Sequence, residues 1–192
     1  MDRVLSELLA AIAAGDDERA EAAACELGRY GDAALPALER LLSADEREQR
    51  WWAVRALAAV GTPAAVAALC AALDDADADV RACAVVALAG LRPPEAIAPL
   101  AGRLGDPSAY VARLVADALA RFGPPAAAAL IAALGSENPA TRAGAARALS
   151  VIQPPEAIPA LCAALDDPSA LVTCYAEEAL EKMGVGMIFF KV

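Results

Sequence analysis

Four aspartates lie within one short segment of the chain and could bind a cation. Asp74, Asp75, Asp77 and Asp79 crowd a single turn. Carboxylate oxygens are ligands that Ca²⁺ prefers, but this segment lacks the glycine and the distant glutamate of an EF-hand loop. Aspartate also caps helix N-termini and interacts favourably with the helix dipole. We therefore expect these residues to start a helix, and we predict no metal site.

The cysteines and the absence of histidine limit the chemistry that the chain can perform. Its five cysteines form no CxxC pair, and it has no histidine, so the usual zinc ligand sets are missing. We expect free thiols, most of them buried, with Cys70 and Cys162 at the same place in two copies of LCAAL. Histidine is the commonest general base and activates nucleophilic serine or cysteine. The sequence thus predicts a protein that is not an enzyme and that has no cofactor.

Composition and charge indicate an acidic helical protein. Hydrophobic residues make up 59% of the chain and aromatic residues 4%, so the apolar surface is mostly alanine and leucine, which favour helices. A net charge of −10 argues against nucleic-acid binding. The longest uncharged stretch, 56–73, is interrupted by Gly61-Thr62-Pro63, so we predict two short helices and no membrane span. The N-terminal segment lacks the basic region of a signal peptide, and we expect a cytoplasmic protein.

Leucines that recur at a nearly constant spacing reveal an internal repeat. One register contains Leu57, Leu88, Leu119, Leu149 and Leu180, at intervals of 31, 31, 30 and 31 residues. A second register contains Leu38, Leu69, Leu100, Leu130 and Leu161. Polar turns separate the two registers, and glycine and proline segments separate successive repeats. Each repeat is therefore expected to contain two apolar helices.

The repeats predict an all-α fold of about six helical hairpins. First helices are expected near 2–14, 33–43, 63–73, 94–104, 125–134 and 155–165, and second helices near 17–30, 46–60, 78–91, 108–122, 138–152 and 170–183. A hairpin of this kind buries its apolar face only against its neighbours. We therefore predict a right-handed α-α superhelix with one elongated core, in a single domain over residues 1–184.

These repeats resemble a known family. A leucine-rich first helix, a D-P or D-D turn and then V-R-x-x-A-x-x-A-L are similar to HEAT repeats, especially the short HEAT-like repeats first named from phycobilin lyases. The best copy is DDADADVRACAVVAL, in which Asp75 precedes Arg81 by six residues. Ser136 and Arg142 keep that spacing with a serine in place of the acid, so the Asp and Arg ladder of the family is incomplete. The resemblance covers about 17–183 and implies a HEAT-like solenoid.

The resemblance also implies that the second helices line a concave groove. Columns of the second helices that do not face the core then face this groove. From these columns we predict the partner-binding residues Trp51, Val54, Arg55, Val85, Val86, Arg113, Asp117, Arg147 and Glu178. The middle of the groove, around Ala82, Val85, Val86, Ala89, Ala116 and Ala120, is small and apolar, which suits a docked helix or peptide. Alanine-rich helices also carry alanine on solvated faces, so both interpretations stay open.

Six arginines on the second helices fall into two groups. Arg50, Arg81 and Arg142 form the first group, and Arg55, Arg113 and Arg147 form the second. The first group is expected to pair with turn acids inside the stack, on the pattern of the family. The second group is expected to contact a partner, while Glu177, Glu178 and Glu181 make the C-terminal end of the groove negative and could orient that partner.

The only two tryptophans are neighbours in the sequence. Trp51 and Trp52 point about 100° apart on a helix, so they cannot face the same way. The register places Trp52 at a core position and Trp51 at a groove position. Tryptophan is enriched at binding hot spots, but Trp51 could equally pack over small residues of the next repeat.

The last residues depart from the repeat pattern. Residues 185–192, VGMIFFKV, are apolar and favour extended structure. We predict that they cover the open end of the last repeat. The alternative is a segment that pairs with another subunit or a partner.

The function predicted from these features is a non-catalytic scaffold or adaptor. We expect a cytoplasmic, bacterial protein that binds a protein or peptide in the concave groove, without nucleic acid or membrane; the oligomeric state stays open. The alternative is a phycobilin-lyase-like factor that handles a tetrapyrrole, with Cys174, Trp51 and the groove arginines as contacts; it rests on the resemblance alone. A DNA-binding protein similar to alkylpurine glycosylases is a third hypothesis, which the acidic charge disfavours.

Overall fold

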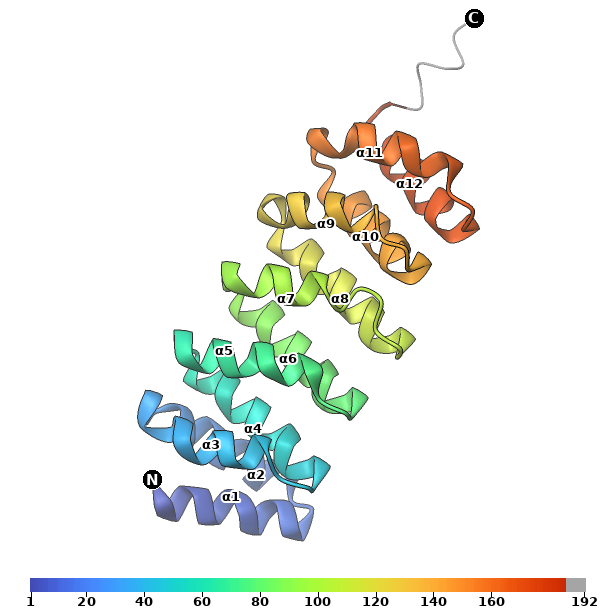
Figure 1. Cartoon of the computed structure of the whole chain (residues 1–192). Coiled ribbons are helices and arrows are strands. Elements are labelled where there is room, and N and C mark those ends of the chain that lie inside the picture. The colour runs from blue at the N-terminus through green and yellow to red at the C-terminus, as the bar shows by residue number, and fades with distance from the viewer. Residues whose placement is uncertain (186–192) are drawn as a thin grey trace, which may run out of the picture. The chain divides into compact units, whose positions relative to one another are not determined.

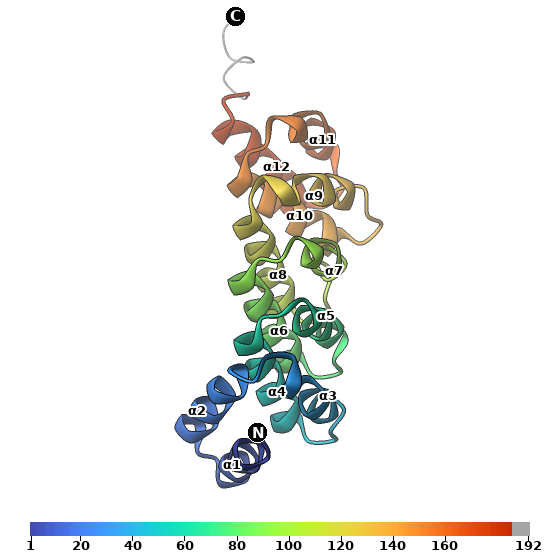
Figure 2. The ribbon, with the colours of Figure 1, turned by 90° about the vertical axis from the view of Figure 1, so that its left-hand side faces the viewer.

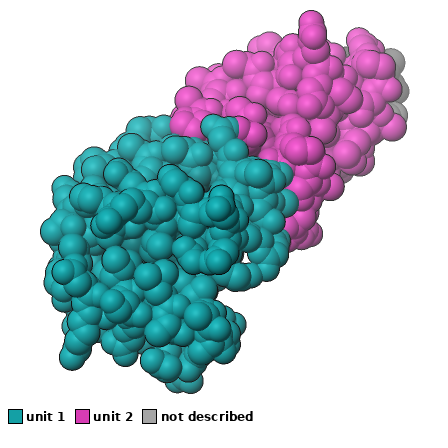
Figure 3. Space-filling view, turned by 60° about the horizontal axis from the view of Figure 1, so that its bottom comes forward, with its two compact units in different colours: residues 1–96 teal, residues 97–192 magenta. Residues whose placement is uncertain are grey.

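The computed structural model describes residues 1–185, and every regular element in this range is a helix (Figure 1). The chain divides into two compact units, residues 1–96 and residues 97–192, which are coloured separately in Figure 3. The predicted all-α class is confirmed. Nearly all of the predicted C-terminal cap, from Gly186 on, lies outside the described residues, and the single domain and the superhelix stay predictions. No described helix is both long enough and apolar enough to cross a membrane.

The helices follow the predicted order of hairpins. Unit 1 contains α1 (Asp2–Ala14), α2 (Asp17–Gly28), η1 (Gly31–Ala34), α3 (Leu35–Leu42), α4 (Arg47–Val60), α5 (Pro63–Ala71), η2 (Ala72–Asp74), α6 (Ala78–Leu91) and η3 (Pro94–Ala96). Unit 2 contains α7 (Ile97–Ala101), α8 (Ala109–Phe122), η4 (Pro124–Ala126), α9 (Ala127–Ala133), α10 (Pro139–Ile152), η5 (Pro155–Ala157), α11 (Ile158–Ala163), η6 (Ala164–Asp166) and α12 (Ala170–Lys182). In unit 1, Figure 2 shows α3 and α5 in one row and α4 and α6 in another.

Most first helices contain a short 3₁₀ turn, where the sequence predicts one continuous α-helix. In the last hairpin, the N–H of Ile158 bonds to the carbonyl of Pro155, three residues earlier. Pro159 follows and has no N–H with which to continue an α-helical pattern. Proline also occupies one of the first two positions of α3. Prolines within the first helices therefore shape how these helices begin.

The second helices start and end as the turn residues predict. At the start of α6 the Asp77 side chain accepts the N–H of Asp79 at 2.8 Å, and at the start of α10 the Asn138 side chain accepts the N–H of Ala140 at 2.9 Å. These bonds confirm side-chain capping at α6 and α10, whereas Glu46 before α4 and Ser169 before α12 form no side-chain capping bond. Gly61 ends α4 with a φ of 63°, a left-handed conformation that suits glycine.

The two leucine registers form the core of each unit. Leu57 and Leu69 are fully buried in unit 1, and Leu119 and Leu130 are fully buried in unit 2. The second helices also contact one another along their lengths, α2 with α4 and α4 with α6 in unit 1, and α8 with α10 and α10 with α12 in unit 2. Small residues permit this close packing, because little side-chain volume separates the helices.

Gly28, at the end of α2, marks a close approach of two second helices in unit 1. A Cβ atom added at Gly28 would lie 2.8 Å from backbone and side-chain atoms of Ala59 in α4. A Cβ atom at Gly90, near the end of α6, would meet no atom within 4 Å. We predict that Gly28→Ala destabilises the protein by about 1–3 kcal/mol, because α2 must move away from α4.

Gly90→Ala is the matched control and should stabilise the protein by about 0.5 kcal/mol, since alanine favours helices more than glycine does. Urea unfolding monitored by circular dichroism measures both changes. Equal effects of the two substitutions would contradict the close approach of α2 and α4.

Candidate partner-binding surface

An arginine near the start of α4 joins two successive repeats of unit 1. Arg50 donates to both carboxylate oxygens of Asp75, at N–O distances of 2.8 and 3.1 Å. It also donates to the carbonyls of Ala44 and Asp45, at 3.0 and 2.9 Å. The side chains of Arg50 and Asp75 are only 15% and 9% exposed. The hydrogen bonds to Asp75 raise the pKa of Arg50 above its ordinary value. The guanidinium thus contacts its own turn and the turn of the next repeat.

The same arrangement recurs in unit 2. Arg142 donates to both carboxylate oxygens of Asp167 at 2.6 and 3.0 Å, and to the carbonyls of Ser136 and Glu137 at 2.9 and 3.0 Å. Asp167 also accepts the N–H of Ser169 at 2.8 Å. The hydrogen bonds from Arg142 lower the pKa of Asp167 below its ordinary value. The expectation that Arg50 and Arg142 pair with turn acids inside the stack is confirmed.

The structure also explains why an aspartate is not needed six residues before each arginine, although the Asp and Arg ladder of the family has one there. Arg81 is buried and donates to the carbonyls of Asp75 and Ala76 at 2.8 and 3.1 Å. The residue six positions before each of these arginines therefore supplies a backbone carbonyl. Any residue type has that carbonyl, so alanine at 44 and serine at 136 serve as well as aspartate. The carboxylate that binds Arg50 or Arg142 comes from a turn 25 residues later in the chain.

The two tryptophans of α4 divide between core and surface as the register predicts. Trp52 is buried and Trp51 is half-buried. Their rings meet edge to face, with centroids 4.9 Å apart and an interplanar angle of 83°. The Cζ atom of Arg55 lies 6.0 Å from the centre of the Trp51 ring, within the range of a cation–π contact. Trp51 is thus held on two sides while part of it stays accessible.

Arg55 has a carboxylate partner that the sequence analysis missed. Its guanidinium donates to both carboxylate oxygens of Glu21 in α2, from Nε at 3.2 Å and from a terminal nitrogen. These hydrogen bonds raise the pKa of Arg55, although burial opposes the charge. Extending the leucine register to Leu27 would have found this partner, because it places Glu21 in the column of Trp51 and Cys25 in the column of Arg55.

Two predicted contact residues of unit 1 do not face the surface. Val54 and Val85 are 0% and 1% exposed, which corrects their placement at the groove. Ala82 and Ala89 of the predicted apolar patch are buried too. The neighbouring second helices pack directly against one another and cover these columns. Val86 is the exception, at 50% exposed, so the accessible part of the predicted site in unit 1 consists of Trp51, Arg55 and Val86.

The remaining predicted residues lie in unit 2. Arg113 is exposed on α8, and its Cζ atom lies 6.0 Å from the ring centre of Tyr110. Arg147 donates to Asp117 at 2.7 Å. Burial opposes the charge of Arg147, but the hydrogen bond to Asp117, helped by Tyr175, raises its pKa overall.

Glu178 and Ala116 are two further residues of unit 2 that the sequence assigned to the groove. Glu178 accepts from Lys182 one turn later, at 2.5 Å. Ala116, which the sequence analysis assigned to the apolar patch, is buried. The accessible predicted residues of unit 2 are therefore Arg113, Asp117, Arg147 and Glu178, and most of their charge is already paired locally.

The thiols differ from expectation. Cys25, Cys162 and Cys174 are exposed, Cys70 is half-buried, and only Cys83 is buried. Burial raises the pKa of Cys83 to about 12, despite the nearby charge of Arg55. Positions that tolerate small residues include solvent-facing ones, which is why the repeat pattern did not predict burial correctly. Within residues 1–185, no group of three cysteine or acidic side chains is placed to hold a metal ion.

In each unit, helical hairpins stack through their second helices. This arrangement is that of an α-helical repeat protein. The family of HEAT repeats matches the chain over residues 5–89, 67–131 and 97–181. These segments span nearly the whole chain. The chain therefore belongs to the HEAT repeat family, as its V-R-x-x-A-x-x-A-L pattern predicts.

Solved structures with similar folds have different activities. The complex of CpcE and CpcF of phycocyanin lyase from Nostoc sp. PCC7120 is 26% identical, with a TM-score of 0.53, over 79% of this chain and 65% of that chain. Human deoxyhypusine hydroxylase in complex with glycerol is also 26% identical, with a TM-score of 0.53, over 96% of this chain and 75% of that chain. An engineered protein is 26% identical over 97% of this chain and 98% of that chain, with a TM-score of 0.49. No protein of curated function matches this chain.

The ion pair of Arg142 and Asp167 predicts a specific pH dependence of stability. Because the pKa of Asp167 is lowered in the folded protein, the stabilisation is fully present above the ordinary aspartate value and is lost as the pH falls toward the lowered value. We expect Asp167→Asn to be less stable than the unmodified protein at pH 7, and the difference to shrink below about pH 4.

Denaturant unfolding between pH 2.5 and pH 7 measures this difference. Asp166→Asn is the matched control, since Asp166 is an exposed neighbour, and should leave the pH profile nearly unchanged. A constant difference between Asp167→Asn and the unmodified protein over the whole range would contradict the assignment.

The burial of the thiols predicts their order of reactivity. The thiolate is the reactive form of cysteine, so a buried group with a raised pKa reacts slowly. We expect iodoacetamide at pH 8 to modify Cys25, Cys162 and Cys174 in the native protein and to spare Cys83, with all five modified after denaturation. Peptide mass spectrometry identifies the modified sites. Modification of Cys83 as fast as Cys25 in the native protein would contradict the structure.

Proposed function

We propose that this protein is a non-catalytic interaction module, and that a cluster of Trp51, Arg55 and Val86 in unit 1 binds a protein or peptide. The observation that carries the proposal is Trp51, which stays accessible while Trp52 and Arg55 fix its position. A large aromatic side chain that is already held in place loses little conformational freedom on binding. Tryptophan and arginine are the residue types enriched at binding hot spots.

The charges around this cluster define what a partner must supply. Glu21 already compensates the charge of Arg55, so the partner need not bring a carboxylate to this point. Val86 adds an exposed aliphatic surface on the next second helix. A partner segment with one apolar face, such as an amphipathic helix, fits this combination.

We propose the exposed residues of unit 2 as a second, more polar contact surface. Arg113 forms no ion pair with a described residue, and its guanidinium is free to bind an acidic group of a partner. Asp117, Arg147 and Glu178 pair with neighbours and would contribute less, because surface ion pairs that already have partners gain little from a new one.

One further function is favoured by a specific comparison. The similarity to the phycocyanin lyase complex supports a protein that handles a bilin, with either the half-buried Trp51 of unit 1 or the exposed Cys174 of unit 2 as a contact. Titration of the purified protein with phycocyanobilin tests this hypothesis. A shifted absorbance band that Trp51→Ala or Cys174→Ala weakens supports it, and an unchanged spectrum contradicts it.

Replacing Trp51 tests the interaction module directly. Loss of a hot-spot tryptophan costs about 2 kcal/mol or more in binding free energy, which is at least a tenfold loss of affinity. We expect Trp51→Ala to abolish capture of partners from native extract, as measured by quantitative mass spectrometry. Val86→Asp should reduce this capture to a smaller extent.

Tyr30→Ala is the matched control, because Tyr30 is an exposed aromatic residue of unit 1 outside the cluster. It should capture the same partners as the unmodified protein. Thermal unfolding of each variant checks that the fold is intact. The proposal fails if Trp51→Ala is folded and captures the same partners, or if Tyr30→Ala loses them equally.

A further inference from the structure

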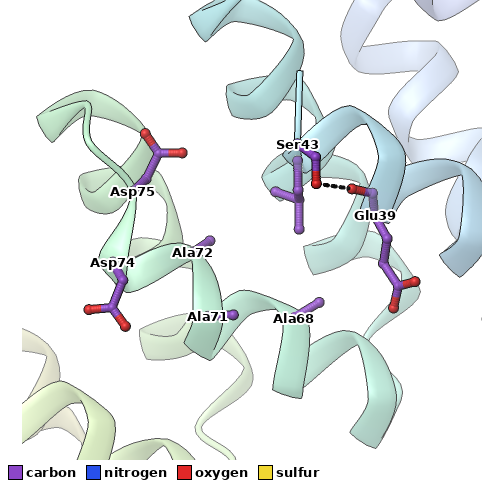
Figure 4. A pocket seen from close by; sticks show the side chains of 8 residues that line it. Glu39, Ser43, Ala68, Ala71, Ala72, Asp74 and Asp75 are labelled. Atoms are coloured by element: carbon purple, nitrogen blue, oxygen red, sulfur yellow. Dashed lines mark hydrogen bonds between the residues drawn. The ribbon is translucent and has the colours of Figure 1, made fainter. Parts of the chain in front are cut away.

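A cleft of about 390 Å³ opens in unit 1 between α3 and the segment formed by α5 and η2 (Figure 4). Its apolar lining consists of Leu42, Ala68, Ala71 and Ala72. The volume lies at the lower end of the range for ligand pockets and holds one or two side chains. The residues that line the cleft do not include Trp51, Arg55 or Val86.

Carboxylates lie at both ends of this apolar lining. Figure 4 shows the carboxylates of Glu39 and Asp74 at opposite ends, with Ala68 and Ala71 between them. The Glu39 carboxylate forms no ion pair with a described residue. Its backbone carbonyl accepts from both the hydroxyl and the backbone N–H of Ser43, each at 3.2 Å. The cleft therefore combines an aliphatic wall with the Glu39 carboxylate, which pairs with no basic side chain in the described part of the chain.

The charge of unit 1 strengthens this preference for cations. Residues 1–96 contain nine basic and seventeen acidic side chains, a net charge of −8. Residues 97–192 contain seven basic and nine acidic side chains, a net charge of −2. Most of the net negative charge of the protein thus lies in the unit that contains the cleft, and it attracts positively charged groups and repels anions.

We propose that the cleft binds the side chain of a lysine or arginine from a basic segment of a partner protein. Both side chains have an aliphatic stem that can lie along Ala68, Ala71 and Ala72 while the charged end stays near solvent. The ammonium or guanidinium group then pairs with Glu39. A neutral aliphatic side chain would leave this carboxylate without a partner, and an acidic side chain would be repelled.

An NMR titration of the full chain tests the proposal with a defined probe. The probe is Nα-acetyl-lysine methylamide, and its counterpart Nα-acetyl-norleucine methylamide has the stem without the charge. We expect the lysine compound to shift the backbone amide signals of residues 39–43 and 68–75, and the norleucine compound to leave them unchanged. The shifts should weaken at high ionic strength, because salt screens the exposed ion pair.

Two variants of the cleft make the test specific. Glu39→Gln should weaken binding of the lysine compound by about two- to five-fold, as expected for one exposed ion pair. Ala71→Leu should abolish binding, because Ala71 is exposed and a larger side chain there fills the cleft without disturbing the core. Glu7→Gln, at an exposed glutamate of α1 outside the cleft, is the control and should bind like the unmodified protein.

Three outcomes would overturn the proposal that the cleft binds a basic side chain. Equal shifts from the lysine and norleucine compounds would show that charge plays no part. Equal weakening by Glu39→Gln and Glu7→Gln would show a general effect of negative charge, and unchanged binding by Ala71→Leu would place the probe elsewhere. None of these results bears on the cluster around Trp51, so the two proposals fail or hold independently.

Discussion

Stacking of the hairpins depends on an arginine that is fixed by two turns at once. In unit 1, Arg50 binds the backbone carbonyls of its own turn and the carboxylate of Asp75 in the next one. Asp75 also accepts the N–H of Asp77 and, through its carbonyl, a bond from Arg81. A single turn residue therefore holds the turn that precedes α6 and ties it to the repeat before. The leucine registers supply the hydrophobic burial, and this ion pair sets how the hairpins align.

This use of arginine determines which surface is left for partners. A stripe of basic residues along the second helices would attract acidic ligands, but Arg50 and Arg142 are almost fully enclosed by their own turns. Among the residues of unit 1 that we consider for binding, Trp51 and Val86 stay accessible, and a cleft opens beside Glu39. We therefore propose an aromatic and aliphatic contact for a partner at Trp51 and Val86, and a contact for a cationic side chain at the cleft.

The sequence predicted the helices well because leucine spacing reports burial directly. The predicted range of α6, 78–91, is the observed one. The sequence failed at Val54 and Val85, because periodicity identifies the faces of a helix without showing how closely the next helix approaches. The pair of Arg55 and Glu21 spans 34 residues, and the cleft is formed by two repeats, so neither is visible within one copy of the motif.

The central claim is that Arg50 acts in stacking and is not part of the partner surface. A double-mutant cycle on Arg50 and Asp75, measured by urea unfolding, tests it against the same cycle on the exposed pair of Arg47 and Asp79. We predict a clearly larger coupling free energy for Arg50 and Asp75, because both side chains are shielded from water and hold further hydrogen bonds. Additive effects at Arg50 and Asp75, or a coupling no larger than that of the exposed pair, would contradict the account.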